Sequence, residues 1–248
     1  MKKMILTCCV LAVFVFTTMC VCAQTEVKPF NGKNLDGWKA VDSNSRNFWV
    51  ASFGSAAVAD DNPQTLVCVP FPEGDSAGVL MNLCGPNWGQ DENQRGVDLY
   101  TEREFGDCIV EIEFMMSKGS NSGVYLMGEY EVQVMDGWGV RRNNLGQGHV
   151  GAIYSAAAPK VNAALEPGQW QKFVIDFVAP RFDADGNKTA NAKFLKVTLN
   201  GQVVQEDVEV PGGSTGGGVT GKEHAKGPLM LQGNHGPVAY RNIVIKEK

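Results

Sequence analysis

Short runs of alternating apolar and polar residues recur along the chain. In the run 108–116, Val110, Ile112 and Phe114 alternate with two glutamates. Successive side chains of a β-strand point to opposite faces of its sheet, so this pattern predicts a strand with one face turned to a core. Outside the first 23 residues, no window of eleven or more residues keeps apolar positions at helical spacing. The chain is therefore expected to be all-β.

Turn-forming residues separate these runs at regular intervals. The clearest case is Asn200-Gly201, which stands between the strand candidates 194–199 and 202–210 and is typical of a two-residue hairpin. Repeated short strands joined by such turns indicate an antiparallel β-sandwich. The sequence has no internal repeat, linker or second core, so residues 24–248 are predicted to form a single domain.

The first 23 residues have the composition of a secretory signal peptide. Two lysines precede the apolar run 4–15, and Val21-Cys22-Ala23 offers small residues for cleavage. The run is shorter than the roughly 20 residues that a membrane span needs, and no later stretch reaches that length. Export to the periplasm or cell surface is therefore expected. The alternative is a lipoprotein anchored through Cys20 or Cys22, which the large preceding residues disfavour.

The charge balance narrows the range of partners. With both leader lysines removed, the formal net charge falls from −5 to −7. No run of basic residues is longer than Arg141-Arg142. Because nucleic acids and anionic membrane surfaces are bound through clustered lysines and arginines, neither is expected as a partner. The oligomeric state stays open.

The cysteines and histidines do not predict a metal centre. Cys68, Cys84 and Cys108 follow the leader, so at most one intramolecular disulfide is expected and its pairing is open. No cysteine pair has zinc-ligand spacing, and the three histidines are scattered. The segment 183–187 faintly resembles a calcium loop but lacks its remaining ligands, and we interpret it as a hairpin turn. The sequence requires no cofactor, and a divalent cation is left as an open alternative.

The segment 121–139, NSGVYLMGEYEVQVMDGWG, carries the most distinctive polar pattern. Alternation from Tyr130 onward puts Glu131, Gln133 and Met135 on one face of a strand. A carboxylate and a carboxamide two residues apart are unusual for a purely structural central strand, and they predict the floor of a ligand site. A solvated outer face is the alternative explanation.

Further candidates follow from their position in loops and on neighbouring faces. An imidazole titrates near neutral pH, which suits proton transfer, and exposed indole rings can pack on sugar C–H surfaces. For each candidate an ordinary structural role is the alternative: a backbone-bonded loop histidine, a core tryptophan or a solvated strand face. The catalytic candidates are Glu131, His235 and His149, and the substrate-binding candidates are Asn121, Gln133, Gln232, Glu113, Trp138 and Lys160, with Trp88 as a second stacking residue.

Four segments in fixed order carry a resemblance to a known family. They are FNGKNLDGW from Phe30, NSGVYLMGEYEVQVMD from Asn121, a long block starting GAIYSAAAPK at Gly151, and GPLMLQGNHGPVAYRNIVIK from Gly227. Together they resemble the 3-keto-disaccharide hydrolase domain family over residues 30–246. The resemblance implies a concanavalin-like jelly-roll sandwich, export, and action on glycosides oxidised at C3 of the sugar.

The chain departs from the family pattern at two positions expected near the site. Met127 stands where an arginine is common, and His235 lies one position later than the histidine that often follows the Leu-Gln pair. The implied chemistry starts from the C3 ketone, which acidifies the proton at C2, so that a general base can remove it and the aglycone can leave from C1. A non-catalytic carbohydrate-binding module and an ordinary glycosidase with two carboxylates are the competing hypotheses.

Overall fold

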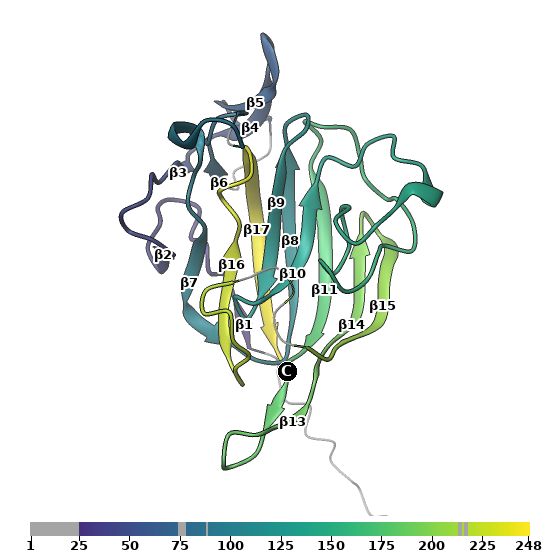
Figure 1. Cartoon of the computed structure of the whole chain (residues 1–248). Coiled ribbons are helices and arrows are strands. Elements are labelled where there is room, and N and C mark those ends of the chain that lie inside the picture. The colour runs from purple at the N-terminus through teal and green to yellow at the C-terminus, as the bar shows by residue number, and fades with distance from the viewer. Residues whose placement is uncertain (1–24, 74–77, 88, 213–214, 216–217) are drawn as a thin grey trace, which may run out of the picture.

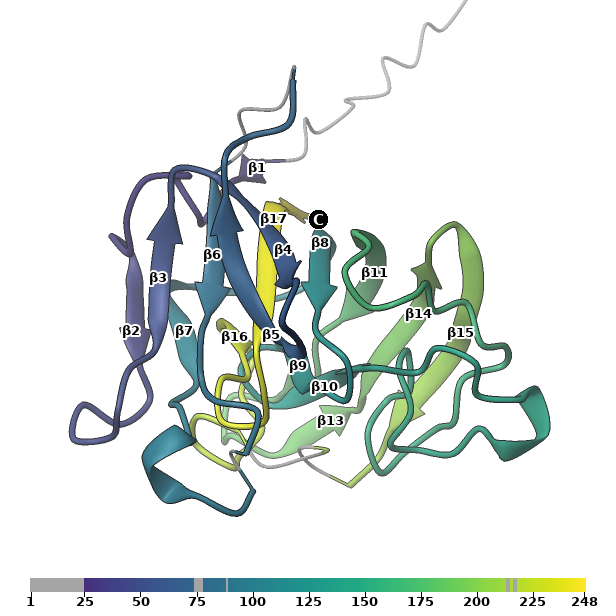
Figure 2. The ribbon, with the colours of Figure 1, turned by 90° about the horizontal axis from the view of Figure 1, so that it is seen from above.

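Two antiparallel sheets packed face to face form the body of the protein (Figures 1 and 2). The computed structural model describes residues 25–73, 78–87, 89–212, 215 and 218–248. It confirms the predicted all-β sandwich, and helical geometry within these ranges is limited to the 3₁₀ turns Glu92–Gln94 and Arg142–Asn144. The predicted leader and Trp88 lie outside the described residues.

The larger sheet has eight strands and contains the two runs with the clearest alternation. Its register aligns Phe173 with Ile112 and Ile175 with Val110, so both apolar faces point the same way. The strands, in spatial order, are β15 (Gln202–Val210), β14 (Ala192–Leu199), β11 (Gln171–Val178), β8 (Cys108–Met116), β17 (Val238–Glu247), β6 (Val79–Asn82) and β3 (Trp49–Ser52), and β1 (Glu26–Val27) also pairs with β17.

The smaller sheet has five strands and includes the segment singled out for its polar pattern. It consists, in spatial order, of β10 (Tyr130–Met135), β9 (Asn121–Leu126), β16 (Gly227–Leu231), β7 (Leu99–Phe105) and β2 (Trp38–Ala40). β9 and β10 form a hairpin joined by residues 127–129, in which Met127 (φ 56°) and Gly128 (φ 70°) both adopt left-handed conformations.

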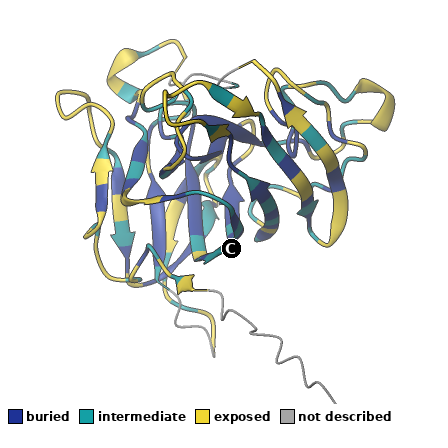
Figure 3. Ribbon diagram, turned by 90° about the horizontal axis from the view of Figure 1, so that it is seen from below, coloured by how far each residue is buried: buried dark blue, intermediate teal, exposed yellow. Residues whose placement is uncertain are grey.

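The core lies between the two sheets and is built from the inward positions of both. Figure 3 shows the buried ribbon concentrated in the central strands. Phe114 and Phe173 stack with ring centroids 4.9 Å apart, and both are fully buried. Each such buried side chain contributes roughly 1.5–3 kcal/mol through apolar burial. The alternation along β8 and β11 therefore decided which face of each strand enters this core.

Two hairpins lie outside the main sheets. β4 (Ser55–Ala59) and β5 (Asn62–Val69) cover part of the outer face of the larger sheet, where Leu66 and Ala56 pack against Met115 and Met81. β12 (Arg181–Phe182) and β13 (Lys188–Ala190) project beyond the sandwich (Figure 1). In their turn the Asp183 carboxylate accepts hydrogen bonds from the Asp185 and Asn187 backbone N–H groups, which supports the hairpin-turn interpretation of this segment.

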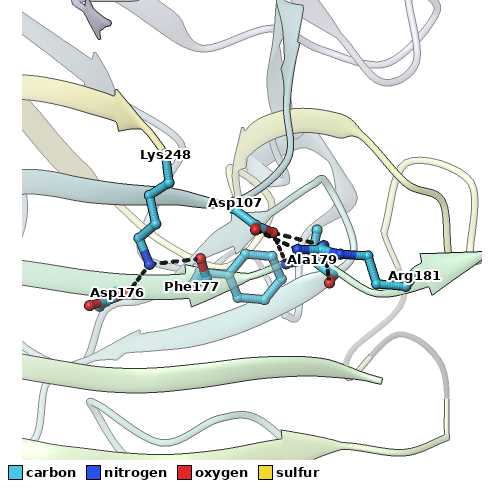
Figure 4. Close-up of polar contacts among 6 residues, drawn as sticks. All are labelled: Asp107, Asp176, Phe177, Ala179, Arg181 and Lys248. Carbon is cyan, nitrogen blue, oxygen red and sulfur yellow. Dashed lines mark hydrogen bonds and ion pairs between the residues drawn. The ribbon is translucent and has the colours of Figure 1, made fainter. Parts of the chain in front are cut away.

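Polar contacts hold the chain end against the larger sheet (Figure 4). Lys248 contacts the Asp176 carboxylate on β11, and Arg181 donates to Asp107 at 2.5 and 2.9 Å. Asp107 also accepts from the Ala179 N–H at 2.8 Å. These contacts hold the ends of β8, β11 and β17 together beneath the core.

The three cysteines after the leader are free thiols in the structure, so none of them forms the disulfide that the sequence left open. Cys84 and Cys108 are buried, and burial raises the pKa of the Cys84 thiol to about 11 and of the Cys108 thiol to about 12. Both thiols therefore stay protonated at neutral pH. Among the described residues no helix is long and apolar enough to cross a membrane.

Candidate functional site

The outward face of the β9–β10 hairpin gathers the polar residues predicted from the sequence. In register, Glu131 lies opposite Tyr125, and Gln133 lies opposite Gly123. Tyr130, Val132 and Val134 point into the core, so Glu131 and Gln133 share the opposite face. That face is not solvated here, because only 2% of Glu131 and 2% of Gln133 is exposed. The structure therefore favours a built polar site over a solvated strand face.

Loop segments close the free edge of β10 beside these side chains. Gly151 N–H donates to the Gln133 carbonyl, and Tyr154 N–H donates to the Glu131 carbonyl at 3.1 Å. The Glu131 N–H itself donates to the Thr215 hydroxyl at 2.7 Å. With its backbone hydrogen bonds satisfied on both sides, β10 holds its side chains in fixed positions.

Glu131 ends a chain of hydrogen bonds that crosses three strands. Gln232 Nε2 donates to the Tyr125 hydroxyl at 3.2 Å, and that hydroxyl donates to the Glu131 carboxylate. The pKa of the Glu131 carboxyl is raised to about 7, mainly by burial. The Tyr125 hydrogen bond lowers this pKa, and the negative charge of Asp98 raises it to a smaller extent. A carboxyl group with this pKa can both accept and donate a proton at neutral pH.

Asp98 is a second carboxyl group of this site, and the sequence analysis missed it. It is half-buried just before β7 and accepts a hydrogen bond from the Gly233 N–H at 2.9 Å. Burial raises its pKa. Nothing in the local sequence marks Asp98, because β7 comes beside β9 only through the intervening strand β16. Tyr125 could have been found, since it faces Glu131 once the 121–135 segment is folded as a hairpin.

Gly123 makes room for the Glu131 carboxyl. A Cβ atom at this position would lie 2.3 Å from Glu131 Oε1 and 2.7 Å from Tyr125 Cε2. Contacts this short do not occur in folded proteins, so any side chain here would displace one of the two groups. A glycine inside a strand weakens the sheet slightly and here permits close approach of the functional side chains.

Two buried amide oxygens of the site have no hydrogen-bond donor among the described residues. Gln133 Nε2 donates to the Asn121 side chain at 2.7 Å, which fixes the orientation of both amides. Gln133 Oε1 and Gln232 Oε1 are buried, and no donor reaches either oxygen from the residues that the structure describes. An unpaired buried acceptor is costly, so these oxygens are suited to accept hydrogen bonds from ligand hydroxyl groups.

His235 lies at the border of the same site. Its carbonyl accepts from the Asn121 N–H at 3.1 Å, and its Nδ1 contacts the Asn234 side chain. Burial, and to a lesser degree the positive charge of Arg95, lowers the pKa of its imidazole. The ring is therefore neutral at pH 7, and it can act as a hydrogen-bond donor or a weak base.

His149 lies in the loop that closes the edge of β10. Its carbonyl accepts from Ala152 N–H, and its Nδ1 accepts from the Gly146 N–H at 2.9 Å. That bond places the proton of the neutral ring on Nε2. The structure thus brings Asn121, Gln133, Gln232 and His235 together with Glu131, and it puts His149 in the adjoining loop.

Three other candidates are not brought to this site. Glu113 lies on the outer face of the larger sheet and pairs with Arg241 at 2.8 Å, so the structure does not bring this substrate-binding candidate to Glu131. Lys160 is exposed and pairs with Glu206 at 2.9 Å. Trp138 follows β10 in an open turn with 56% of its surface exposed. These three candidates lie away from Glu131 because they belong to the other sheet or to loops outside the β9–β10 hairpin.

Met127, one of the two departures from the family pattern, supplies an apolar wall rather than a charge. Its side chain is 4% exposed and belongs to the main core cluster. It also borders a pocket beside Glu129. No group of three or more metal-binding side chains occurs within the described ranges, so the residues present do not form a recognisable metal centre.

Comparisons with known proteins agree with this architecture. The family described as 3-keto-alpha-glucoside-1,2-lyase-like domain matches residues 25–246. A crystal structure from Parabacteroides distasonis ATCC 8503, provisionally assigned as a glycosyl hydrolase, is 28% identical and covers 90% of this chain and 84% of its own, with a TM-score of 0.59.

A second provisionally assigned glycosyl hydrolase of that organism is similar in fold, at 15% identity and a TM-score of 0.51, covering 90% of this chain and 94% of its own. Comparison with curated proteins gave no match. The family match and the first of these structures place the chain among carbohydrate-active proteins.

Proposed function

Because this chain belongs to the family of 3-keto-α-glucoside-1,2-lyase-like domains, we propose that it is an enzyme that cleaves 3-keto-glycosides. The observation that carries the proposal is the Glu131 carboxyl, buried on the polar sheet face with a pKa of about 7. Catalytic sites often contain a carboxyl group with a shifted pKa that lies among several polar side chains.

The reaction proceeds by elimination followed by addition of water. The C3 ketone acidifies the C2 proton. When a base removes that proton, the C–H electron pair forms the C2=C3 double bond of an enolate, whose negative charge lies on the C3 oxygen. The enolate electrons then form a C1=C2 double bond and expel the aglycone oxygen, which takes up a proton. Addition of water at C1 gives the free 3-keto sugar, so the net result is hydrolysis.

Glu131 is the proposed base in the first step. Its pKa of about 7 leaves a large ionised fraction at neutral pH, and its conjugate acid is strong enough to protonate the departing oxygen. Tyr125 keeps its proton because burial and the neighbouring Glu131 raise its pKa. The phenol therefore acts as a donor that orients the carboxylate.

The surrounding groups are suited to bind the sugar. Gln133 Oε1 and Gln232 Oε1 are acceptors for sugar hydroxyl groups. The charge of Arg95 acts on both Asp98 and His235, so a positive charge lies near this part of the site. Asp98, with its raised pKa, is a second group able to exchange a proton.

The site of action is proposed to lie outside the cytoplasm. The charged, apolar and small-residue regions of positions 1–23 support export to the periplasm or cell surface. Sequencing of the N-terminus of the protein recovered from a periplasmic fraction tests this: a mature chain starting at Gln24 supports it, and an intact Met1 in that fraction contradicts cleavage.

The decisive experiment compares methyl 3-keto-α-glucoside with its unoxidised parent. We expect release of methanol from the keto substrate alone, with a transient conjugated enone, and slower turnover when C2 carries deuterium. Release from the parent would instead indicate an ordinary glycosidase. Binding without release from either would indicate a carbohydrate-binding module and would overturn the proposal.

A further inference from the structure

Glu131 has a tyrosine beside it on each side of β10. On β9, Tyr125 pairs with Glu131 in register. At the free edge of β10, Val132 and Ile153 form an antiparallel bridge, and the Tyr154 N–H donates to the Glu131 carbonyl at 3.1 Å, so Tyr154 lies opposite Glu131. Residues directly opposite each other on antiparallel segments have Cβ atoms about 4.5–5.5 Å apart. The structure thus adds Tyr154, which the sequence analysis did not single out, to the neighbours of the proposed base.

The Tyr154 side chain points to the same outer face as Glu131. Ile153 lies opposite Val132, and both side chains are fully buried in the core. Because successive side chains of an extended segment alternate, Tyr154 points the other way. The electrostatics agree: the pKa of the Tyr125 hydroxyl is raised mainly by burial, and Tyr154 is among the neighbours that raise it further. The two phenols therefore lie near each other.

The Tyr154 hydroxyl is available to a ligand. Of this residue, 38% is exposed, and no group in the described part of the chain forms a hydrogen bond with its hydroxyl. Together with Thr215 it borders a surface pocket of about 370 Å³. The Tyr125 hydroxyl, in contrast, is already bonded to Gln232 and Glu131. Of the two phenols beside Glu131, Tyr154 is thus the one that can donate to a substrate.

The proposed reaction requires a hydrogen-bond donor close to its base. Removal of the C2 proton puts negative charge on the oxygen of the adjacent carbon C3, so the charge develops next to the place where Glu131 acts. Donors held ready at such an oxygen lower the barrier. A phenol is more acidic than an aliphatic hydroxyl or an amide N–H, and it therefore forms the stronger hydrogen bond to an enolate.

We propose that the Tyr154 hydroxyl donates a hydrogen bond to the C3 oxygen of the substrate and stabilises the enolate formed when Glu131 removes the C2 proton. The inference rests on the proposed function, which supplies the ketone. In this step the proton passes from C2 to Glu131, the C–H electron pair forms the C2=C3 bond, and the carbonyl π pair moves onto the C3 oxygen. Tyr154 keeps its proton, and its role differs from that of Tyr125, which orients the base.

The test compares Tyr154→Phe with Tyr100→Phe, using methyl 3-keto-α-glucoside. Tyr100 is a half-exposed tyrosine of the same sheet, separated from Tyr125 by Met230 in register, so it is a matched control for loss of a phenol hydroxyl. Tyr154→Phe should lower kcat roughly 100- to 1,000-fold, as expected for loss of one oxyanion donor. Its KM should stay within about threefold of wild type, because the bond strengthens only as charge develops. A near-normal kcat, or an equal loss in both variants, overturns the assignment.

A second measurement isolates enolate formation from cleavage. The substrate analogue 1,5-anhydro-3-keto-glucitol has the C2 proton and the ketone but no aglycone, and exchange of its C2 proton in D₂O is followed by NMR. Glu131→Gln and Tyr154→Phe should each slow this exchange by roughly 100-fold or more, and Tyr100→Phe should not. Wild-type exchange in Tyr154→Phe overturns the inference alone. If wild type neither exchanges this proton nor cleaves the methyl glycoside, the proposed function fails and the inference fails with it.

Discussion

The Tyr125 hydroxyl donates a hydrogen bond to the Glu131 carboxylate across the β9–β10 hairpin, at positions that face each other in register. The bond favours the ionised carboxylate and therefore acts against the burial that raises its pKa. The balance of these two influences sets the proton affinity of the group at the centre of the site. Four predictions follow from this arrangement.

Replacing Glu131 by glutamine should lower turnover of a 3-keto-glycoside by roughly 100- to 10,000-fold, as expected for loss of a general acid–base group. Steady-state rates measure the effect, and circular dichroism checks the fold. Glu113→Gln is the matched control, because Glu113 pairs with Arg241 on the other sheet and should leave the rate nearly unchanged. A near-normal rate in Glu131→Gln would make His235 the leading candidate for the base.

Replacing Tyr125 by phenylalanine should shift the pH–rate profile. Without the phenol donor the ionised form of Glu131 loses a hydrogen bond, so its pKa rises above about 7. The limb of the kcat profile that reports the base should therefore move to higher pH, with the largest rate loss near neutral pH. An unshifted limb would show that Tyr125 does not control the ionisation of the catalytic group.

Glu131 should make the protein less stable as pH rises. Its folded pKa of about 7 exceeds the ordinary value of 4.5, so between these values the folded state binds a proton that the unfolded state has released. Stability falls with pH across this window, by up to roughly 3 kcal/mol at about 1.4 kcal/mol per pKa unit. The raised pKa of Asp98 acts in the same direction.

Glu131→Gln removes this contribution. Denaturant unfolding at pH 4.5 should give nearly the same unfolding free energy for the variant and for wild type. At pH 8 the variant should have the higher unfolding free energy. Parallel curves for the two proteins across this range would mean that Glu131 titrates near its ordinary pKa.

Replacing Gly123 by alanine should reduce activity more than stability. The new methyl group would lie 2.3 Å from Glu131 Oε1, so the flexible carboxyl group must move while the strand remains paired. We expect kcat/KM to fall at least about tenfold, since small displacements of catalytic groups are costly, with a small change in Tm. Gly212→Ala, whose added Cβ meets no atom within 4 Å, provides the control. Full activity in Gly123→Ala would show that the position of Glu131 tolerates displacement.

Much of the fold could be predicted because each part depends on local spacing. Alternation along 108–116 and 173–178 identified β8 and β11 and the faces that enter the core. Asn200 and Gly201 both have positive φ, at 51° and 79°, as the predicted hairpin between β14 and β15 requires. These features involve neighbours in the chain, whose geometry does not depend on the rest of the fold.

The candidate site could be predicted only in part. Glu131, Gln133 and Asn121 lie on one hairpin, so period-two spacing placed them together. Glu113 has the same spacing pattern, but its strand joined the other sheet and its charge found Arg241. The alternation of a strand shows that two faces exist and does not show which sheet the strand joins.

By itself, the sequence determined an all-β chain, its strand faces and the polar face of β10, because side-chain period and turn chemistry are local. Tertiary structure decided the rest. It buried that face and closed the free edge of β10 with residues 151–154 and Thr215, and it brought Asp98 and Gln232 to Tyr125 and Glu131 from distant parts of the chain. Burial raised the pKa of Glu131, and burial depends on which segments pack over a residue, which no local pattern specifies.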